Sequence, residues 1–221
     1  MAGEVAPGAV ASRAVAPGTA GAPARVVLAS QSPRRRDLLA LVGIAHEVRP
    51  ADVDEAVHPG EAPDAYVRRL AVDKARTVAE ALGDPAAAVL AADTTVVVDG
   101  EILGKPADAA EARAMVGRLA GRAHEVYTGM AAVRGARAAD AVERVRVTFR
   151  PLTAAEVAAY VATGEPMDKA GAYGIQGYGA TIVERVEGDY FAVMGLSLVR
   201  ATALLAEVGV AYAFAGGARA G

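Results

Sequence analysis

The stretch "VVLASQSPRRRDLL", Val26–Leu39, joins an apolar segment, a short polar loop and a run that begins with three arginines. Its pattern predicts a strand over Arg25–Ala29. It also predicts a helix with Ser32 as N-cap and Pro33 at the first helical position. Exposed cations at a helix N-terminus are each unfavourable by roughly 0.3–1 kcal/mol, because this end carries partial positive charge. Three arginines in the first turn therefore need a physical explanation.

A bound anion would explain the arginine cluster. A loop that leads into a helix N-terminus presents backbone N–H groups to an anion, and arginine adds paired donors suited to phosphate oxygens. The alternative is a solvated basic turn whose side chains extend into water. Neither G-x-x-x-x-G-K-[ST] nor G-x-G-x-x-G occurs in the chain, so the two familiar nucleotide-binding loops are excluded. The stretch predicts a phosphate site of another kind.

Outward from this stretch, strand and helix patterns alternate, which predicts an α/β domain. Asp99-Gly100 is a hairpin signal, and two capping boxes, Asp108/Glu111 and Thr153/Glu156, open helices. The predicted strands after the first are Ala88–Ala92, Val96–Val98, Glu101–Leu103, Val126–Val133, Val142–Phe149 and Thr181–Val186. The predicted helices after the first are Ala65–Leu82, the segment from Asp108 to before Gly121, the segment from Thr153 to Val161, and Leu196–Val208.

Composition limits the kind of protein this is. The chain has 221 residues, 53% of them hydrophobic, which is enough for one sizeable core. A net charge of -3 excludes a global basic field for nucleic acid, and the absence of cysteine excludes disulfides and thiolate metal sites. No apolar run approaches the roughly 20 residues that span a bilayer, so we expect no membrane partner.

The ends of the chain differ from its middle. Residues 1–24 are rich in Ala, Gly and Pro and lack the basic start and apolar run of a secretory signal, so they predict a disordered tail. Residues 213–221 predict a second, flexible tail of similar composition. Without a targeting signal, the cytoplasm is the expected location.

Three charged residues stand out inside the predicted domain. Asp93 follows a continuous apolar strand, and ligands of α/β sheets bind beyond the carboxyl ends of strands. The alternative is that Asp93 caps the following turn. Lys74 lies on the apolar stripe of a predicted helix, where it either extends to water or points its cation into a cleft. Lys105 lies in a loop, where a lysine is ordinarily a surface residue.

Two further segments carry polar groups. Asp54 and Glu55 lie in an irregular acidic loop, and with Asp93 they could supply carboxylate oxygens to Mg²⁺. The glycine-rich segment Gly164–Ala180 carries Gln176, which could hydrogen-bond a base edge or a ribose; the alternative is a purely structural loop. The three histidines have no metal-ligand spacing.

Taken together, these segments resemble the Maf family of nucleoside triphosphate pyrophosphatases. The resemblance extends in the family's order over nearly all of Arg25–Val210. Its pieces are "LASQSPRR" (Leu28–Arg35), "DVDE" (Asp52–Glu55), "DKA" (Asp73–Ala75), "AADTTV" (Ala91–Val96), "LGKP" (Leu103–Pro106), "LAGRAHEVYTG" (Leu119–Gly129), "EPMDKAGAYGIQG" (Glu165–Gly177) and "GDYFAVMGL" (Gly188–Leu196). One departure is Ser197, which stands where the family often has proline.

The resemblance implies one pyrophosphatase domain over residues 25–212. Its implied fold is a mixed, twisted α/β sheet with flanking helices, in two lobes around a central cleft, like that of the inosine triphosphate pyrophosphatases. Its implied reaction is hydrolysis of nucleoside triphosphates between the α- and β-phosphates to a nucleoside monophosphate and pyrophosphate, which cleanses the nucleotide pool. "DTTV" matches the branch that prefers dTTP and UTP, whereas the branch that acts on 7-methyl-GTP typically has Gln at the position of Thr94.

The resemblance also implies roles for individual residues. Ser30, Arg34 and Arg35 would hold phosphates, and Lys74 and Lys105 would neutralise charge. Asp93 would accept a proton, and Glu55 would bind a divalent metal, Mg²⁺ or Mn²⁺. Whether Asp93 acts as a base directly or as a metal ligand stays open. The residues tied to base choice are Arg34, Thr94 and Gln176.

Two alternatives to catalysis remain at this stage. Members of the family are also linked to cell-division arrest, so the chain could be a non-catalytic nucleotide-sensing protein. The family also suggests that the chain forms a homodimer. The other alternative is an RNA-binding protein that uses the arginine cluster. The acidic balance and the 5% of aromatic residues argue against RNA, so a small nucleotide is the expected partner.

Overall fold

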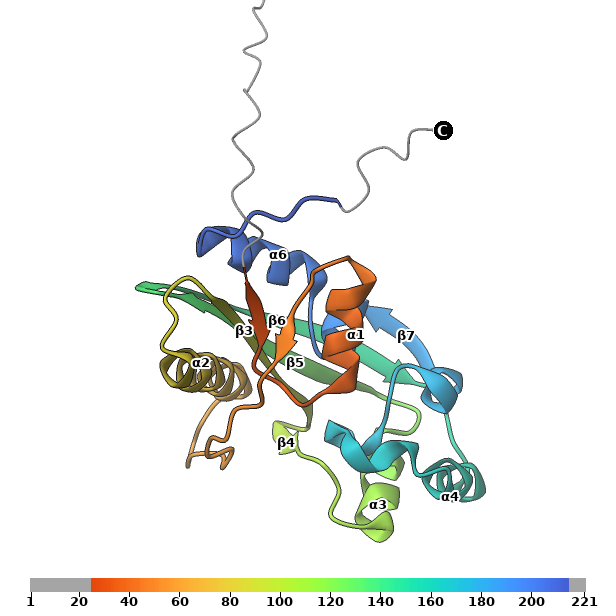
Figure 1. The fold of residues 1–221 in the computed structure, drawn as a ribbon. Helices are drawn as coiled ribbons and strands as arrows, with labels where there is room; N and C mark the ends of the chain where they lie inside the picture. The colour runs from red at the N-terminus through yellow and green to blue at the C-terminus, as the bar shows by residue number, and fades with distance from the viewer. Residues whose placement is uncertain (1–24, 215–221) are drawn as a thin grey trace, which may run out of the picture.

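The computed structural model describes residues 25–214, in which one mixed sheet of seven strands carries helices on both faces (Figure 1). The predicted α/β class, a mixed twisted sheet with flanking helices, is confirmed. The tail predicted at residues 1–24 lies outside the described residues, as does all but the start of the tail predicted at 213–221.

The strands run in the order β2-β1-β3-β5-β6-β7, and β4 also pairs with β3. β2, β1 and the first part of β3 pair in parallel, whereas all other recorded pairs are antiparallel. The predicted hairpin turn Asp99-Gly100 joins β3 to β4, and the two-residue β2 was not predicted. The bounds are β1 (Val26–Leu28), β2 (Glu47–Val48), β3 (Ala88–Val98), β4 (Glu101–Leu103), β5 (Ala123–Arg134), β6 (Arg137–Phe149) and β7 (Val183–Glu187).

β3 differs from its prediction in a way that matters for the site. The prediction that Asp93 ends a strand is wrong, because β5 pairs with β3 without a break on both sides of it. The opposite edge of β3 pairs with β1 as far as Leu90 and with β4 only from Val96 onward. Residues 91–95 therefore border an opening in the sheet, where β1 and β4 separate.

The helices include one that the sequence did not predict, α5, which ends at Gly195 with a positive φ of 115°. The last helix, α6, consequently begins later than predicted, and the Ser197 hydroxyl accepts a hydrogen bond from its first turn. No helix in residues 25–214 combines the length and apolar character needed to cross a membrane. The bounds are α1 (Pro33–Leu41), α2 (Pro63–Leu82), α3 (Ala109–Leu119), α4 (Ala154–Ala162), α5 (Tyr190–Met194) and α6 (Leu198–Glu207), with short 3₁₀ turns η1 (Glu165–Asp168), η2 (Ala170–Ala172) and η3 (Gly177–Thr181).

The core forms on both faces of β3, because successive residues of a strand point to opposite faces. Val89 and Ala91 pack with α2, whereas Leu90 and Ala92 pack with α1 and α6. The second half of β3 packs with α3 and α4 (Figure 1). Apolar clusters thus lie on either side of the opening, as the predicted two lobes require. At the opening, the alternation of side chains along β3 turns Asp93 toward α2 and Thr94 toward α1.

Gly129 permits the close contact between α2 and the sheet. This glycine lies opposite Asp93 in β5, and a Cβ atom on it would come within 2.2 Å of the Val67 carbonyl oxygen. Since that atom belongs to the backbone of α2, it cannot move aside without displacing the helix. Lys74 lies two turns after Val67 in α2, so the close contact at Gly129 fixes the distance between Lys74 and Asp93.

The two predicted capping boxes have different outcomes. The one at α4 is confirmed: the Thr153 side chain accepts from the Glu156 N–H, and the Glu156 side chain accepts from the Thr153 N–H. At α3, Asp108 accepts from two N–H groups of the first turn as predicted. The Glu111 carboxylate, however, accepts from the Ala107 N–H one residue before the cap, so this box is only half formed.

Candidate active site

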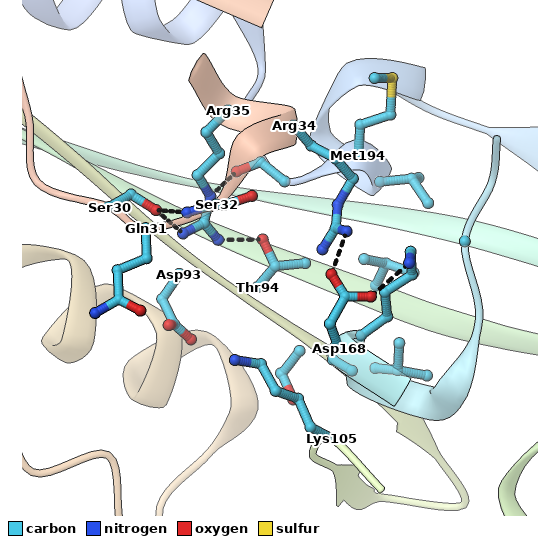
Figure 2. A pocket seen from close by; sticks show the side chains of 18 of the residues that line it. Ser30, Gln31, Ser32, Arg34, Arg35, Asp93, Thr94, Lys105, Asp168 and Met194 are labelled. Atoms are coloured by element: carbon cyan, nitrogen blue, oxygen red, sulfur yellow. Dashed lines mark hydrogen bonds and ion pairs between the residues drawn. The ribbon is translucent and has the colours of Figure 1, made fainter. Parts of the chain in front are cut away.

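A cleft of about 780 Å³ occupies the opening between β1 and β4 (Figure 2). Its walls come from the loop before α1, the acidic loop before α2, the middle of β3, the loop after β4 and the glycine-rich segment. The residues to which the resemblance gives a role all line this cleft: Ser30, Arg34, Arg35, Glu55, Lys74, Asp93, Thr94, Lys105 and Gln176. The structure thus brings together residues that lie up to 146 positions apart in the chain (from 30 to 176).

Lys74 is buried and lies between two carboxylates. Its Nζ is 2.7 Å from Asp93 Oδ1 and 2.5 Å from Glu55 Oε1. The Lys74 side chain is only 10% exposed, so the alternative in which it extends to water is wrong. The ammonium stays inside because the carboxylates compensate for its lost hydration.

Asp93 comes from the middle of a strand, and its side chain is 12% exposed. The alternative in which it caps a turn is wrong, because β3 continues past it. Figure 2 shows its carboxylate turned into the cleft, with the end of Lys105 on the same side. A charged group at this depth is held by its ion pair with Lys74 and by its access to the cleft.

The loop that carries Glu55 is fastened to α2 at two adjacent carbonyl groups. The Tyr66 hydroxyl donates to the Glu55 carbonyl oxygen at 3.0 Å, and Arg69 Nη2 donates to the Ala56 carbonyl oxygen at 2.9 Å. Burial and the charges of Asp93 and Glu55 raise the pKa of Tyr66 to about 12, so its hydroxyl remains a donor. The sequence analysis missed Tyr66. Its position two helical turns before Lys74, on the same face of α2, is the signal that could have found it.

Glu55 is ionised at neutral pH. Burial acts to raise the pKa of its carboxyl group, but the hydrogen bond and charge of Lys74, with the charges of Lys105 and Arg35, hold that pKa below its ordinary value. The contribution from Lys105 is informative, because this lysine is exposed and lies on a loop. It is close enough to act electrostatically on the Glu55 carboxylate across the cleft.

Arg35 joins three elements through its guanidinium. Nη1 donates to Ser30 Oγ at 3.0 Å, Nη2 to Thr94 Oγ1 at 3.1 Å and Nε to the Gly195 carbonyl oxygen at 2.8 Å. Burial lowers the pKa of Arg35, and the charge of Asp93 opposes that effect. The protein itself supplies acceptors for this cation, so the solvated-turn alternative is wrong for Arg35.

The other two arginines of the cluster behave differently from Arg35 and from each other. Arg34 Nη1 donates to Asp168 Oδ2 of η1 at 3.0 Å, which links opposite walls of the cleft (Figure 2). Arg36 is exposed and pairs only loosely, at 3.3 Å, with its neighbour Asp37. The solvated-turn alternative therefore describes Arg36 alone.

Ser32 occupies the N-cap position of α1, but its side chain makes no capping hydrogen bond. The prediction of a Ser32 cap is wrong in this respect. Ser30 closes the loop instead, because its hydroxyl oxygen accepts from the Ser32 N–H at 3.2 Å as well as from Arg35. The Ser30 side chain thereby fixes both the loop and the arginine beside it.

Thr94 and Gln176 line the cleft from different elements, β3 and the glycine-rich segment. Thr94 Oγ1 is 3.0 Å from Thr128 Oγ1, and the Thr128 hydroxyl donates to the Ala192 carbonyl oxygen of α5 at 2.8 Å. This connection ties α5 to the sheet beneath Arg35. Gln176 is exposed and immediately precedes η3 in the glycine-rich segment.

Glu165 holds the glycine-rich segment in one conformation. Its Oε1 accepts from the Tyr160 hydroxyl and from the Gly179 N–H, both at 2.9 Å, and its Oε2 accepts from the Tyr178 N–H at 2.8 Å. The sequence analysis did not single out Glu165. A carboxylate at the start of a glycine-rich segment, whose backbone N–H groups need acceptors, was the available signal. The segment that presents Gln176 is therefore fixed by polar contacts.

The chain is similar to known proteins over most of its length. Residues 25–208 match the family model described as Maf-like protein. The dTTP/UTP pyrophosphatase of Anaeromyxobacter sp. (strain Fw109-5) is 55% identical over 190 residues, which are 84% of this chain and 90% of the relative. The protein of the same name from Moorella thermoacetica is 53% identical over 188 residues, 84% of this chain and 96% of the relative.

Among solved structures, the Ham1 protein of Staphylococcus aureus matches 57% of this chain and 71% of its own, with 16% identity and a TM-score of 0.42. The family match covers every element from β1 through α6, together with the whole cleft. The chain therefore belongs to the family of Maf-like proteins.

Proposed function

We propose that this chain is a nucleoside triphosphate pyrophosphatase that hydrolyses dTTP and UTP between the α- and β-phosphates. The observation that supports it best is the group formed by Lys74, Asp93 and Glu55 in a cleft that Arg35 and Lys105 also line. The names of the relatives, dTTP/UTP pyrophosphatase, support the choice of substrate and reaction.

The cations of the cleft suit a triphosphate. Hydrolysis of a phosphoanhydride depends mainly on positioning and on neutralising the charge of the transferring and leaving groups. Lys74 and Lys105 would neutralise phosphate oxygens, and Arg35 with Ser30 would position them. Arg35 uses three N–H groups on the protein, so two of its five remain for phosphate oxygens.

Asp93 is the residue best placed to handle the water nucleophile. A water oxygen attacks a phosphorus atom beside the oxygen that bridges the α- and β-phosphates, and the phosphorus–oxygen bond on the leaving side breaks. Asp93 accepts a proton of that water, which leaves nucleoside monophosphate and pyrophosphate as products. The ion pair with Lys74 orients the carboxylate for this task.

A divalent cation, Mg²⁺ or Mn²⁺, fits the donor set. Glu55 and Asp93 converge on one Lys74 ammonium, so their oxygens lie close together. No group of three or more His, Cys, Asp or Glu side chains suited to a metal occurs within residues 25–214. Two carboxylates completed by water and substrate phosphates are a common arrangement for Mg²⁺. When bound there, the cation would supply charge neutralisation on the phosphates.

Base choice would fall to Arg34, Thr94 and Gln176, which come from different walls of the cleft. Asp54, which the sequence analysis considered as a third carboxylate for the metal, instead accepts from the Ala56 N–H within its own loop.

The partner we propose is a free nucleotide. We propose that it is used in the cytoplasm, where nucleoside triphosphates are made. A homodimer is the proposed assembly, which light scattering of the purified chain tests directly.

The decisive experiment incubates the purified chain with Mg²⁺ or Mn²⁺ and each common nucleoside triphosphate. We expect pyrophosphate and the monophosphate from dTTP and UTP, resolved by chromatography. Orthophosphate with a diphosphate product would place the cleavage elsewhere. Binding of nucleotide without turnover would favour the alternative of a nucleotide-sensing protein. The names of the relatives do not mention cell-division arrest, so the proposal is confined to hydrolysis.

A further inference from the structure

The cleft has two chemically different ends. Asp93, the partner of Lys74, lies at one end, whereas Arg34 and Asp168 lie at the other, beside Met194 (Figure 2). Met194 packs in the same apolar cluster as Ile175, and both line the cleft. A site for a planar base needs apolar walls and a few placed polar groups. The Arg34 end has this character. At the other end, Lys74 and Lys105, with the divalent cation that Glu55 and Asp93 would hold, would suit phosphates.

Asp168 is held from two sides and still faces the cleft. Its Oδ2 accepts from Arg34 at 3.0 Å, and its Oδ1 accepts from Lys169 Nζ at 2.5 Å. Lys169 is itself fixed, because its Nζ also donates to the Glu165 carbonyl oxygen at 2.5 Å. The Asp168 side chain remains 58% exposed. Each carboxylate oxygen can accept more than one hydrogen bond, so Asp168 has capacity for another donor.

An ionised carboxylate can accept a hydrogen bond from an N–H group of a base, but it has no donor for a phosphate oxygen. Burial acts to raise the pKa of Asp168, but the hydrogen bonds from Lys169 and Arg34 hold that pKa below its ordinary value. At neutral pH the group is therefore ionised and can only accept. Arg34 beside it can only donate. Together they present one donor and one acceptor side by side to whatever occupies this end.

We propose that Asp168 is a specificity-determining residue that accepts the ring N3–H of uracil or thymine while Arg34 donates to an adjacent carbonyl oxygen of the base. The inference rests on the proposed function, since it concerns the base of the same substrates. Uracil and thymine carry a ring N–H between two carbonyl oxygens, which matches the pair. Cytosine has a bare N3 lone pair and an amino group there. With the cytosine ring in the position that uracil would take, this lone pair would face the carboxylate of Asp168 and the amino group would face the guanidinium of Arg34.

The test compares UTP, CTP and N3-methyl-UTP, which lacks the N–H, in the wild-type chain and in Asp168→Asn. We expect wild type to prefer UTP over both analogues in kcat/KM. Asp168→Asn should reduce the UTP-to-CTP preference roughly tenfold or more, because its amide can donate to N3 of cytosine. Asp99→Asn is the matched control, because it also removes a carboxylate from an arginine pair, with Arg122, but lies at the turn after β3. It should keep the wild-type preference.

Two outcomes would overturn the inference. Equal losses for UTP and CTP in Asp168→Asn would mean that Asp168 only positions Arg34, and equal wild-type activity on UTP and N3-methyl-UTP would exclude an acceptor at N3. If no triphosphate is hydrolysed at all, the proposed function fails separately. Calorimetry with UMP and CMP then decides the inference. Tighter UMP binding that is lost in Asp168→Asn supports it, and equal binding of the two by wild type overturns it.

Discussion

Lys74 and Asp93 form a buried ion pair in which the lysine Nζ lies 2.7 Å from the aspartate Oδ1, with both side chains close to 10% exposed (10% and 12%). The pair joins α2 to the middle of β3, and Glu55 adds a second carboxylate at 2.5 Å from the same ammonium. The net charge of this group is negative, so the cations of Arg35 and Lys105 across the cleft are needed before a triphosphate can approach.

Replacement of Asp93 by asparagine keeps the shape of the side chain but removes its charge and basicity. We expect kcat for dTTP to fall by roughly 10²-fold or more if Asp93 accepts the water proton. Circular dichroism should be unchanged, because Lys74 keeps Glu55 as a partner. Asp84→Asn, on a surface turn, is the control and should retain full activity. Wild-type turnover in Asp93→Asn would remove Asp93 from the mechanism.

Loss of the lysine should affect stability as well as activity. Lys74→Met leaves the Asp93 carboxylate buried without its cation, which costs about 3 kcal/mol for a pair of this kind. The double variant Lys74→Met/Asp93→Asn should recover part of that loss, since it removes the uncompensated charge. Urea unfolding of the four proteins in the cycle measures the coupling. Strictly additive losses would show that the pair contributes nothing to stability.

The arginines of α1 should separate into structural and dispensable residues. Arg35→Ala removes three hydrogen bonds and leaves a carbonyl and two hydroxyl groups to find new partners, so we expect a loss of about 2–3 kcal/mol together with weaker dTTP binding. Arg36→Ala, one residue along and exposed, should stay within about 0.5 kcal/mol of wild type. Thermal melting without ligand and calorimetry with nucleotide measure the two effects. Equal behaviour of both variants would contradict the assignment.

The close packing of α2 on the sheet predicts that a larger residue at Gly129 destabilises the fold. Gly129→Ala would place a Cβ atom 2.2 Å from the Val67 carbonyl oxygen and should destabilise the fold by about 3 kcal/mol or more, with loss of activity as Lys74 is displaced. Gly117→Ala is the matched control, because a Cβ there meets nothing within 4 Å and the site lies inside α3. That variant should gain about 0.5–1 kcal/mol. The two stabilities are measured by denaturant unfolding. A Gly129→Ala variant more stable than Gly117→Ala would refute this account of the contact between α2 and the sheet.

Stability should decline in mild acid because of a buried histidine. Burial, with a smaller contribution from the charge of Arg122, lowers the pKa of His124 from 6.5 to about 4. Between these values the unfolded chain binds a proton that the folded protein does not. The free energy of unfolding is therefore largest above pH 6.5 and falls by about 3 kcal/mol in all as the pH drops through 4.

The His124→Gln variant isolates this contribution. Glutamine can keep a hydrogen bond to the Tyr173 hydroxyl, which lies 2.7 Å from His124 Nε2, but it does not titrate. Urea unfolding between pH 4 and 7 should show a shallower decline for this variant than for wild type. His58→Gln, on the surface, should follow the wild-type curve. Parallel curves for wild type and His124→Gln would assign the acid sensitivity to other groups.

Local sequence patterns determined a large part of this protein. Apolar periodicity located the main strands and helices, and the capping residues of α3 and α4 set where those helices begin. The elements could be located because periodicity and capping depend on residues only a few positions apart. The nine site residues, which the resemblance to the family implied, all line the cleft. The chemistry of the side chains then narrowed the ligand to a polyphosphate.

Only the tertiary structure decided how those residues meet. Continuous pairing with β5 makes Asp93 part of β3, and the separation of β1 from β4 opens the cleft beside it. The partners of Lys74, Arg34 and Arg35 lie 19, 134 and up to 160 positions away in the chain. Strand pairing and side-chain contacts over such separations depend on the packed fold as a whole. No local pattern encodes them. The sequence alone therefore predicted a ligand for the arginine cluster, whereas in the fold Arg34 and Arg35 already have acceptors within the protein.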